Sequence, residues 1–311
     1  MSSKILTKPW PYLALFIAHT IWGINFVVAK VTLQEFPTYS LAFLRFAIAF
    51  ILLAPFFIAQ TKRVKIKKVD LPKLIWIGLF MVTFNITFFF TGIQKTTAID
   101  ASVLTLTIPM LSVLFGWWFL KEHIYTINLA GIALGLLGAV VIVGAPKFLT
   151  GTYSTDSLIG NILIVFASIS WVAGGTISRK ILKTYSSLEV TGIVFLVGVI
   201  TFLLPAVSEY LKDPTWPSRI STLGFLGLTY MALLSSISAY FLFEWGLSRT
   251  SIVAADLFQY WEPFMATFVA VLVLGEEITI PFIIGAILIT GGVYMGTLAK
   301  EIHHRLHYHR H

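Results

Sequence analysis

The sequence predicts an all-helical membrane protein of about ten transmembrane helices, built as two inverted five-helix repeats and so described as 5+5. Composition is the first reason. Of the 311 residues, 57% are hydrophobic and 12% are charged, whereas a soluble domain carries about 25% charged residues. The second reason is that apolar stretches of about 20 residues, enough to span a bilayer as a helix, recur along the whole chain. The third is an internal repeat.

The apolar stretches place the predicted spans at residues 11–30, 38–58, 72–93, 98–120, 126–145, 158–179, 187–207, 220–247, 251–274 and 278–299. Lys and Arg gather on one side of these spans, above all in the run from Lys62 to Lys73 and again at Arg179, Lys180 and Lys183. Because cytoplasmic segments carry the excess of basic residues, both termini are predicted to be cytoplasmic. We expect a multi-pass protein of the cell inner (cytoplasmic) membrane.

The two copies of the internal repeat align without gaps. The segment GIQKTTAID, which starts at Gly92, has its counterpart 154 residues later, so that Pro109 pairs with Pro263 and Glu122 with Glu276. The repeat divides the chain into a first unit, a second unit and a histidine-rich cytoplasmic tail without an assigned function, at residues 1–150, 151–300 and 301–311.

An odd number of helices in each unit forces the second unit to enter the membrane upside down. Inverted repeats of this kind are typical of secondary transporters, which alternate access around a site near the middle of the membrane. The alternative is a duplication in a membrane protein that transports nothing.

The residues also resemble a known family. WGINFVVAK at Trp22–Lys30, followed by Pro37 and LRF at Leu44–Phe46, resembles the opening of EamA-type members of the drug/metabolite transporter (DMT) superfamily. EPFMATFVAVLVLGEEI at Glu262–Ile278 is similar to the signature of their second half. The resemblance implies a DMT-like fold in which spans 1–4 and 6–9 surround a cavity and spans 5 and 10 support it. It also implies transport of amino acids, other metabolites or drugs, often outward.

Two prolines are predicted to interrupt helices near the middle of the membrane. A proline inside a helix removes one backbone hydrogen bond and crowds the carbonyl four residues earlier. Pro109 and Pro263 are therefore predicted to free the carbonyls of Thr105 and Gln259. They are either a matched pair of hinges beside the substrate or two structural kinks.

Ionisable residues inside a membrane are costly and are candidates for function. Glu262 has three interpretations: contact with a cationic or zwitterionic substrate, transfer of a coupling proton, or a structural pair with Arg45. Glu244 is an acid that the family pattern does not show, and its alternative to a substrate contact is an extended side chain that reaches the interface.

Further polar and aromatic residues complete the predicted cavity. At an offset of 149 residues the repeat also matches Trp22 with Trp171, and aromatic rings beside acids suit organic cations or aromatic zwitterions. The predicted lining is Trp22, Asn25, Asn85, Trp171, Tyr240, Glu244, Gln259, Tyr260 and Glu262. His19 lies one turn before Trp22 on the same side. Glycines of the fifth and tenth spans are spaced for close helix packing.

The sequence predicts a transporter and no enzyme. It carries no phosphate-binding glycine loop and no nucleophile elbow or paired metal ligands within the spans, so we expect no cofactor, no metal and no nucleic-acid partner. The expected partners are a small-molecule substrate, membrane lipids and, as the candidate coupling ion, protons, with the chain acting as a monomer. The leading hypothesis is secondary active or facilitative export of amino acids or related compounds and drugs. The alternatives are import of a cationic or zwitterionic nutrient, a flippase for lipids or lipid-linked sugars, and a channel or receptor.

Overall fold

A computed structural model describes residues 10–63, 66–120, 127, 129–138, 141, 154–250, 255 and 257–308. Within these residues every regular element is helical, in agreement with the sequence prediction. Glu122, the boundary predicted after residue 150 and the last three residues of the tail lie outside the described residues. The predicted span 126–145 is described only in part.

We call the residues before 150 the N-terminal half and those after it the C-terminal half. The N-terminal half holds α1 (Trp10–Thr32), α2 (Thr38–Arg63), α3 (Leu71–Gly78), η1 (Leu79–Phe84), α4 (Asn85–Ile93), α5 (Ala98–Leu104), α6 (Thr107–Leu120) and the helix Leu129–Gly138. The C-terminal half holds α8 (Thr155–Ile181), α9 (Ser187–Lys212), η2 (Trp216–Arg219), α10 (Thr222–Tyr230), η3 (Met231–Ser238), α11 (Ala239–Arg249), η4 (Leu257–Tyr260), α13 (Trp261–Leu274) and α14 (Ile280–Tyr308).

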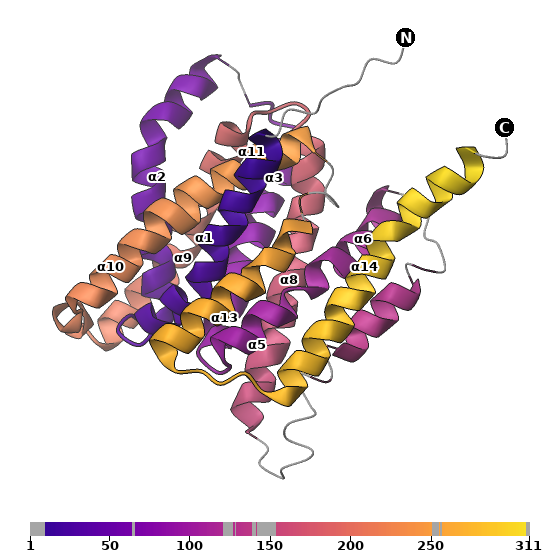
Figure 1. The fold of residues 1–311 in the computed structure, drawn as a ribbon. Helices are drawn as coiled ribbons and strands as arrows, with labels where there is room; N and C mark the ends of the chain where they lie inside the picture. The colour runs from indigo at the N-terminus through magenta and orange to yellow at the C-terminus, as the bar shows by residue number, and fades with distance from the viewer. Residues whose placement is uncertain are drawn as a thin grey trace.

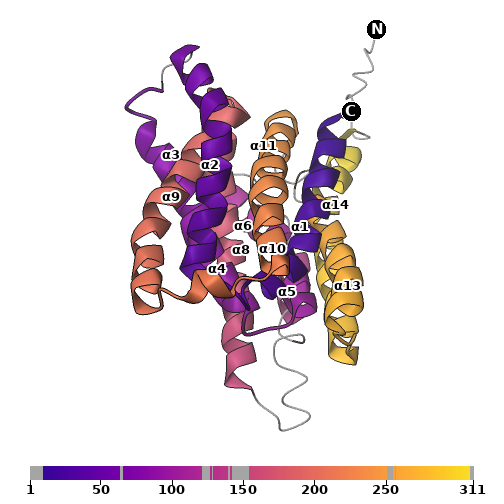
Figure 2. The ribbon, with the colours of Figure 1, turned by 90° about the vertical axis from the view of Figure 1, so that its left-hand side faces the viewer.

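The helices form one bundle in which α2 lies along α9 and α1 lies between α11 and α13 (Figures 1 and 2). In both views α1 begins and α14 ends at the same end of the bundle. We call the opposite end the distal end; it carries the connections at residues 33–37, 94–97, 213–221 and 275–279.

Seven helices of the described residues are long and apolar enough to cross a membrane, and three shorter apolar helices accompany them. The short ones are Leu129–Gly138, Phe258–Leu274 and Ile280–Gly292. Each of the ten predicted spans overlaps one of these helices. Ile280–Gly292 lies within α14, which continues to Tyr308, and the count of ten crossings stays a prediction.

Two spans contain a π-helical stretch that the sequence did not predict. In the span Leu71–Ile93 it is η1, and in the span Thr222–Arg249 it is η3. A π-helical turn widens the helix and changes the pairing of its carbonyls, and such turns are frequent at functional sites. They occupy similar places in the two halves of the chain.

The two prolines that were predicted inside helices lie instead in the first turn of a new helix. α5 ends at Leu104, Thr105 lies in the turn that follows, and a new helix, α6, starts at Thr107, so that Pro109 is its third residue. Pro263 is likewise the third residue of α13, which follows the 3₁₀ turn η4. A proline is tolerated in the first helical turn because that N–H has no intrahelical partner. The Thr105 carbonyl is not free, since the N–H of Ile108 donates to it at 2.9 Å.

Glycines let the helix Leu129–Gly138 approach α14 closely, as predicted for the fifth and tenth spans. A Cβ atom at Gly138 would lie 2.7 Å from the carbonyl oxygen of Gly285, and one at Gly292 would lie 2.7 Å from the nitrogen of Gly135. Neither distance is possible for a real side chain. Small residues therefore bring these two helices into backbone contact.

Gly23 sets the distance between α1 and α13, and this gives a prediction of stability. A Cβ there would lie 2.9 Å from the carbonyl oxygen of Glu262 and 2.7 Å from Cβ of Met265. We expect Gly23→Ala to lower the thermal unfolding midpoint in detergent because α13 must move away from α1. The matched control is Gly175→Ala, which meets no atom within 4 Å and gains up to about 1 kcal/mol of helix propensity. Equal midpoints for the two variants would contradict the packing described.

Candidate functional site

A cavity lies between helices of the two halves. It measures about 90 Å³, well below the roughly 300–1,000 Å³ of sites for drug-sized ligands. The residues that line it are Trp22, Asn25, Phe26, Arg45, Asn85, Ile86, Phe89, Thr105, Ile108, Trp171, Ser235, Tyr240, Gln259 and Glu262. The lining is therefore a mixture of aromatic rings, apolar side chains and a few polar groups, which is the usual composition of a small-molecule site.

Three aromatic rings form one wall and meet edge to face. The ring of Trp22 lies 5.2 Å from that of Trp171 and 5.6 Å from that of Tyr240, and the last two are 5.7 Å apart. These spacings are within the 4.5–7 Å range in which aromatic pairs attract. The two tryptophans that the repeat matches thus touch each other across the two halves of the chain.

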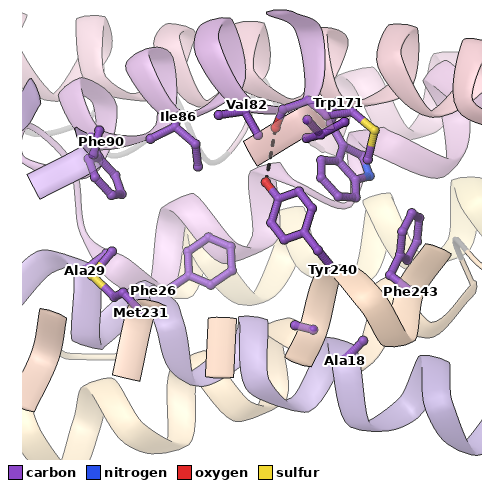
Figure 3. Packing of buried hydrophobic residues seen from close by; sticks show 14 of the residues in the cluster. Ala18, Phe26, Ala29, Val82, Ile86, Phe90, Trp171, Met231, Tyr240 and Phe243 are labelled. Carbon is purple, nitrogen blue, oxygen red and sulfur yellow. Dashed lines mark hydrogen bonds between the residues drawn. The ribbon is translucent and has the colours of Figure 1, made fainter. Parts of the chain in front are cut away.

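The polar ends of this wall bind the backbone of the π-helical stretches. The hydroxyl of Tyr240 donates to the carbonyl of Met81 at 3.1 Å, the dashed line in Figure 3. The indole N–H of Trp22 donates to the carbonyl of Ser235 at 3.0 Å, and the hydroxyl of Ser170 donates to that of Phe80 at 2.7 Å. Side chains from other helices therefore satisfy carbonyls of η1 and η3 next to the cavity.

The predicted pair of Arg45 and Glu262 is wrong for this structure. The Nδ1 of His19 donates to Oε1 of Glu262 at 2.7 Å, and the side-chain amide of Gln259 donates to Oε2 at 2.9 Å. Glu262 and His19 are both buried. The carboxylate finds partners on α1 and in η4, so it does not need the guanidinium of Arg45, although both groups line the same cavity.

Among the residues that the structure describes, the partners of Arg45 are all neutral. Its Nε donates to the hydroxyl of Ser236 at 2.8 Å and its Nη2 to that of Ser235 at 3.2 Å. Its guanidinium carbon lies 4.9 Å from the ring centre of Phe46. Burying a charge costs several kcal/mol, and a cation–π contact offsets about 0.5–2 kcal/mol of that. The side chain is 2% exposed, and its Nη1 has no hydrogen-bond partner within the described part of the chain.

Two predicted lining residues lie elsewhere. Glu244 is not in the cavity lining, and its two oxygens accept from the hydroxyl of Ser178 at 2.9 and 3.1 Å. Its side chain is 1% exposed, so the alternative prediction that it reaches the interface is also wrong, because Ser178 on α8 holds it inside the bundle. Tyr260 lies in η4 beside Gln259 but does not line the cavity.

Sequence reasoning missed several lining residues. They are Phe26, Ile86, Phe89, Ile108 and Ser235, together with the side chain of Thr105. Most are apolar side chains of a type that is abundant in this chain, so the sequence offers no signal that separates them from lipid-facing residues. His19 was placed on the correct side of α1, but its contact with Glu262 joins residues 243 positions apart and has no local signal.

At the distal end a carboxylate from the C-terminal half caps a helix of the N-terminal half. The oxygens of Glu276 accept from the N–H groups of Ala98 and Ile99, the first two residues of α5, at 2.9 and 3.0 Å. Lys30 at the end of α1 lies 3.1 Å from the same carboxylate. Gly275, with φ of 63°, ends α13 in the left-handed conformation that glycine favours, and the chain turns so that Glu276 reaches α5.

Two more carboxylates cross between the halves at this end. The oxygens of Glu209 in α9 accept from the N–H groups of Tyr39 and Ser40 in the first turn of α2, at 3.1 and 2.7 Å. Glu35 accepts from the N–H and hydroxyl of Ser221, the residue that caps α10, at 2.6 Å each. The bonds from Ser221 lower the pKa of Glu35 below its ordinary value. Anions at helix N-termini are favourable, and these three join the two halves.

Comparison with known proteins gives the chain its family. The model of the EamA-like transporter family matches residues 9–144 and again residues 158–298. The chain belongs to the EamA-like transporter family, within the drug/metabolite transporter superfamily. It is therefore a multi-pass membrane protein of a family of transporters, and no catalytic family is indicated.

Relatives of similar length support the assignment to this family. An uncharacterized transporter of Archaeoglobus fulgidus is 28% identical over 93% of this chain and 98% of its own length. A probable amino-acid metabolite efflux pump of Salmonella typhimurium is 29% identical over 94% of this chain and 95% of its own length. A protein of the same description from Escherichia coli is 29% identical over 91% of this chain and 93% of its own length. A crystal structure at 21% identity superposes with a TM-score of 0.63 over 93% of this chain and 97% of that chain, which shows the fold alone.

The caps at the distal end give a second prediction of stability. Glu276→Ala removes two charge-assisted hydrogen bonds to α5 and leaves Lys30 without its carboxylate, a loss of about 1–3 kcal/mol. We expect a lower thermal unfolding midpoint in detergent. The neighbouring exposed Glu277 is the matched control, and Glu277→Ala should leave the midpoint unchanged. An equal decrease in both variants would show that loss of charge, and not the cap, is responsible.

Proposed function

We propose that this protein is a secondary transporter that exports amino acids or closely related small metabolites by alternating access. The observation that carries the proposal is the cavity whose wall is built by Trp22 and Trp171, two residues in matching positions of the two halves, with their ring centres 5.2 Å apart. A site enclosed by two related halves near the middle of the membrane is the arrangement by which such transporters work.

The proposed architecture is ten spans in two inverted units, at residues 1–150 and 151–300. Support comes from α1 and α8, which run in opposite directions in Figure 1, and from the two regions that the family model matches. The basic residues Arg63, Lys67 and Lys180 lie at the end of the bundle where α1 begins. By the positive-inside rule that end is cytoplasmic, and the distal end then faces outward.

Contacts at the distal end support alternating access. The three carboxylates Glu35, Glu209 and Glu276 bind helix N-termini across the two halves. Under the proposed orientation these contacts close the outer face in this conformation. They are few, polar and partly exposed, so the halves separate there at a cost of a few kcal/mol. The prolines Pro109 and Pro263, each just after an interruption of a helix, are the proposed hinges.

The choice of substrate class rests on the size and chemistry of the cavity. A space of about 90 Å³ favours a small metabolite over a drug. The names of the two efflux pumps among the relatives favour amino acids and outward movement. Import of a cationic or zwitterionic nutrient remains the second candidate, because Glu262 lines the cavity.

The transport proposal predicts accelerated counterflow in proteoliposomes. Vesicles loaded with an unlabelled amino acid should take up the labelled form faster than empty vesicles, with saturation, and Trp22→Ala should lose most of this flux. Trp117, 55% exposed on α6, provides the control, since Trp117→Ala should keep it. Flux without saturation or counterflow would indicate a channel. Movement of labelled phospholipids in place of amino acids would support the flippase alternative.

Proton coupling gives a second functional prediction. Glu262 contacts His19 on α1 and Gln259 in η4, and it shares the cavity with Arg45 and Tyr240. We propose that Glu262 carries the coupling proton. The neutral variant Glu262→Gln should keep amino-acid exchange but lose the response of net flux to an imposed pH gradient. If the gradient drives the variant as well as the original protein, Glu262 is not the proton carrier.

A further inference from the structure

We propose that Arg45 binds the carboxylate of the transported molecule, so that the cavity selects free amino acids and rejects their amides and the corresponding amines. This inference rests on the proposed transport function and adds the group of the substrate that the site recognises. The charge of Arg45 in the cavity lining has no counter-charge among the described residues.

Among the described residues no carboxylate pairs with Arg45. The ion pairs of the structure involve other residues, and the one carboxylate in the cavity lining, that of Glu262, is bound by His19 and Gln259. The partners of Arg45 are two serine hydroxyls and the faces of Phe46 and Phe90. All of them are neutral. A buried charge is normally paired or bound to an ion, so the missing partner is an anion.

The serines leave a defined part of the guanidinium for that anion. They occupy Nε and Nη2, while the buried Nη1 has no partner among the described residues, and Arg45 belongs to the cavity lining. A guanidinium offers five N–H donors in a planar fork that matches a carboxylate. Since the serines and the two rings hold this fork in place, a bound carboxylate meets an anchor that is already oriented.

A second unpaired group points to the other end of the same ligand. The side-chain oxygen of Asn25, a residue also in the cavity lining, is buried and has no hydrogen-bond partner among the residues described. An amide oxygen accepts hydrogen bonds, and an ammonium group supplies them. The guanidinium of Arg45 can bind a carboxylate, and the oxygen of Asn25 can accept from an ammonium group. Because both residues line the same cavity, they match a molecule that carries a carboxylate and an amino group.

The test compares three matched series in the full-length protein. Alanine, leucine and phenylalanine are each supplied as the free acid, as the carboxamide and as the decarboxylated amine, and each is measured by thermal shift in detergent and by inhibition of counterflow. We expect the acids to bind at least about 100-fold more tightly than their amides and amines, the size of effect seen when one partner of a buried charge pair is removed. Equal binding of acid and amide within every series would overturn the inference.

Variants provide the second arm. Arg45→Gln should bind acid and amide of the same series equally, while Arg249→Gln, which removes an exposed arginine stacked on Trp245, should keep the preference for the acid. Because the ligand comparison needs no variant, misfolding of Arg45→Gln would not decide the outcome. A preference for the acid that persists in folded Arg45→Gln would assign carboxylate recognition to another residue and overturn the inference.

Failure of the transport function and failure of the role of Arg45 give different results. Counterflow of amino acids together with equal counterflow of amides would leave the transport function in place and remove only the role of Arg45. If no compound of any series binds or is transported, both the proposed transport function and the role of Arg45 are wrong.

Discussion

A polar group inside the hydrocarbon core of a membrane has no bulk water to bind, so the protein itself must supply its partner. In this chain that constraint places the buried polar side chains where another helix can meet them. Glu244 turns to Ser178, Asn85 to the carbonyl of Ala167, and Glu262 to His19. Each of these bonds joins helices that are far apart in the sequence, and together they fix the positions of the helices around the cavity.

The same constraint explains the irregular helices. A π-helical stretch or a break at a proline leaves carbonyls in unusual positions, and here the side chains of Trp22, Ser170 and Tyr240 bind the carbonyls of η1 and η3. The carbonyl of Thr105 accepts instead from the backbone N–H of Ile108, three residues later. Irregular backbone is therefore concentrated beside the cavity, where these side chains satisfy it, and the cavity owes its shape to these departures from regular helix.

The sequence predicted much of the fold, because apolar stretches and an internal repeat are signals that survive without a structure. Every predicted span overlaps a helix, and seven of the nine predicted lining residues line the cavity. The errors of the sequence-based prediction concern which side chains meet across the bundle. The sequence marks Arg45 and Glu262 as deep and opposite in charge, but it does not show that His19 is closer to the carboxylate. The π-helical stretches contain neither proline nor an unusual composition, so nothing in the sequence marks them.

The central claim is that one cavity between the two halves opens alternately to the two faces of the membrane. The chain contains no cysteine, so a single cysteine at Thr105, in the cavity lining, can be labelled with a membrane-impermeant maleimide without background. Ser168→Cys, buried outside the cavity, is the control and should resist labelling. The account predicts that Thr105→Cys is labelled from either face, in right-side-out and inside-out vesicles, and that a transported amino acid changes the ratio of the two rates. Labelling from one face only, whatever solute is present, would contradict alternating access.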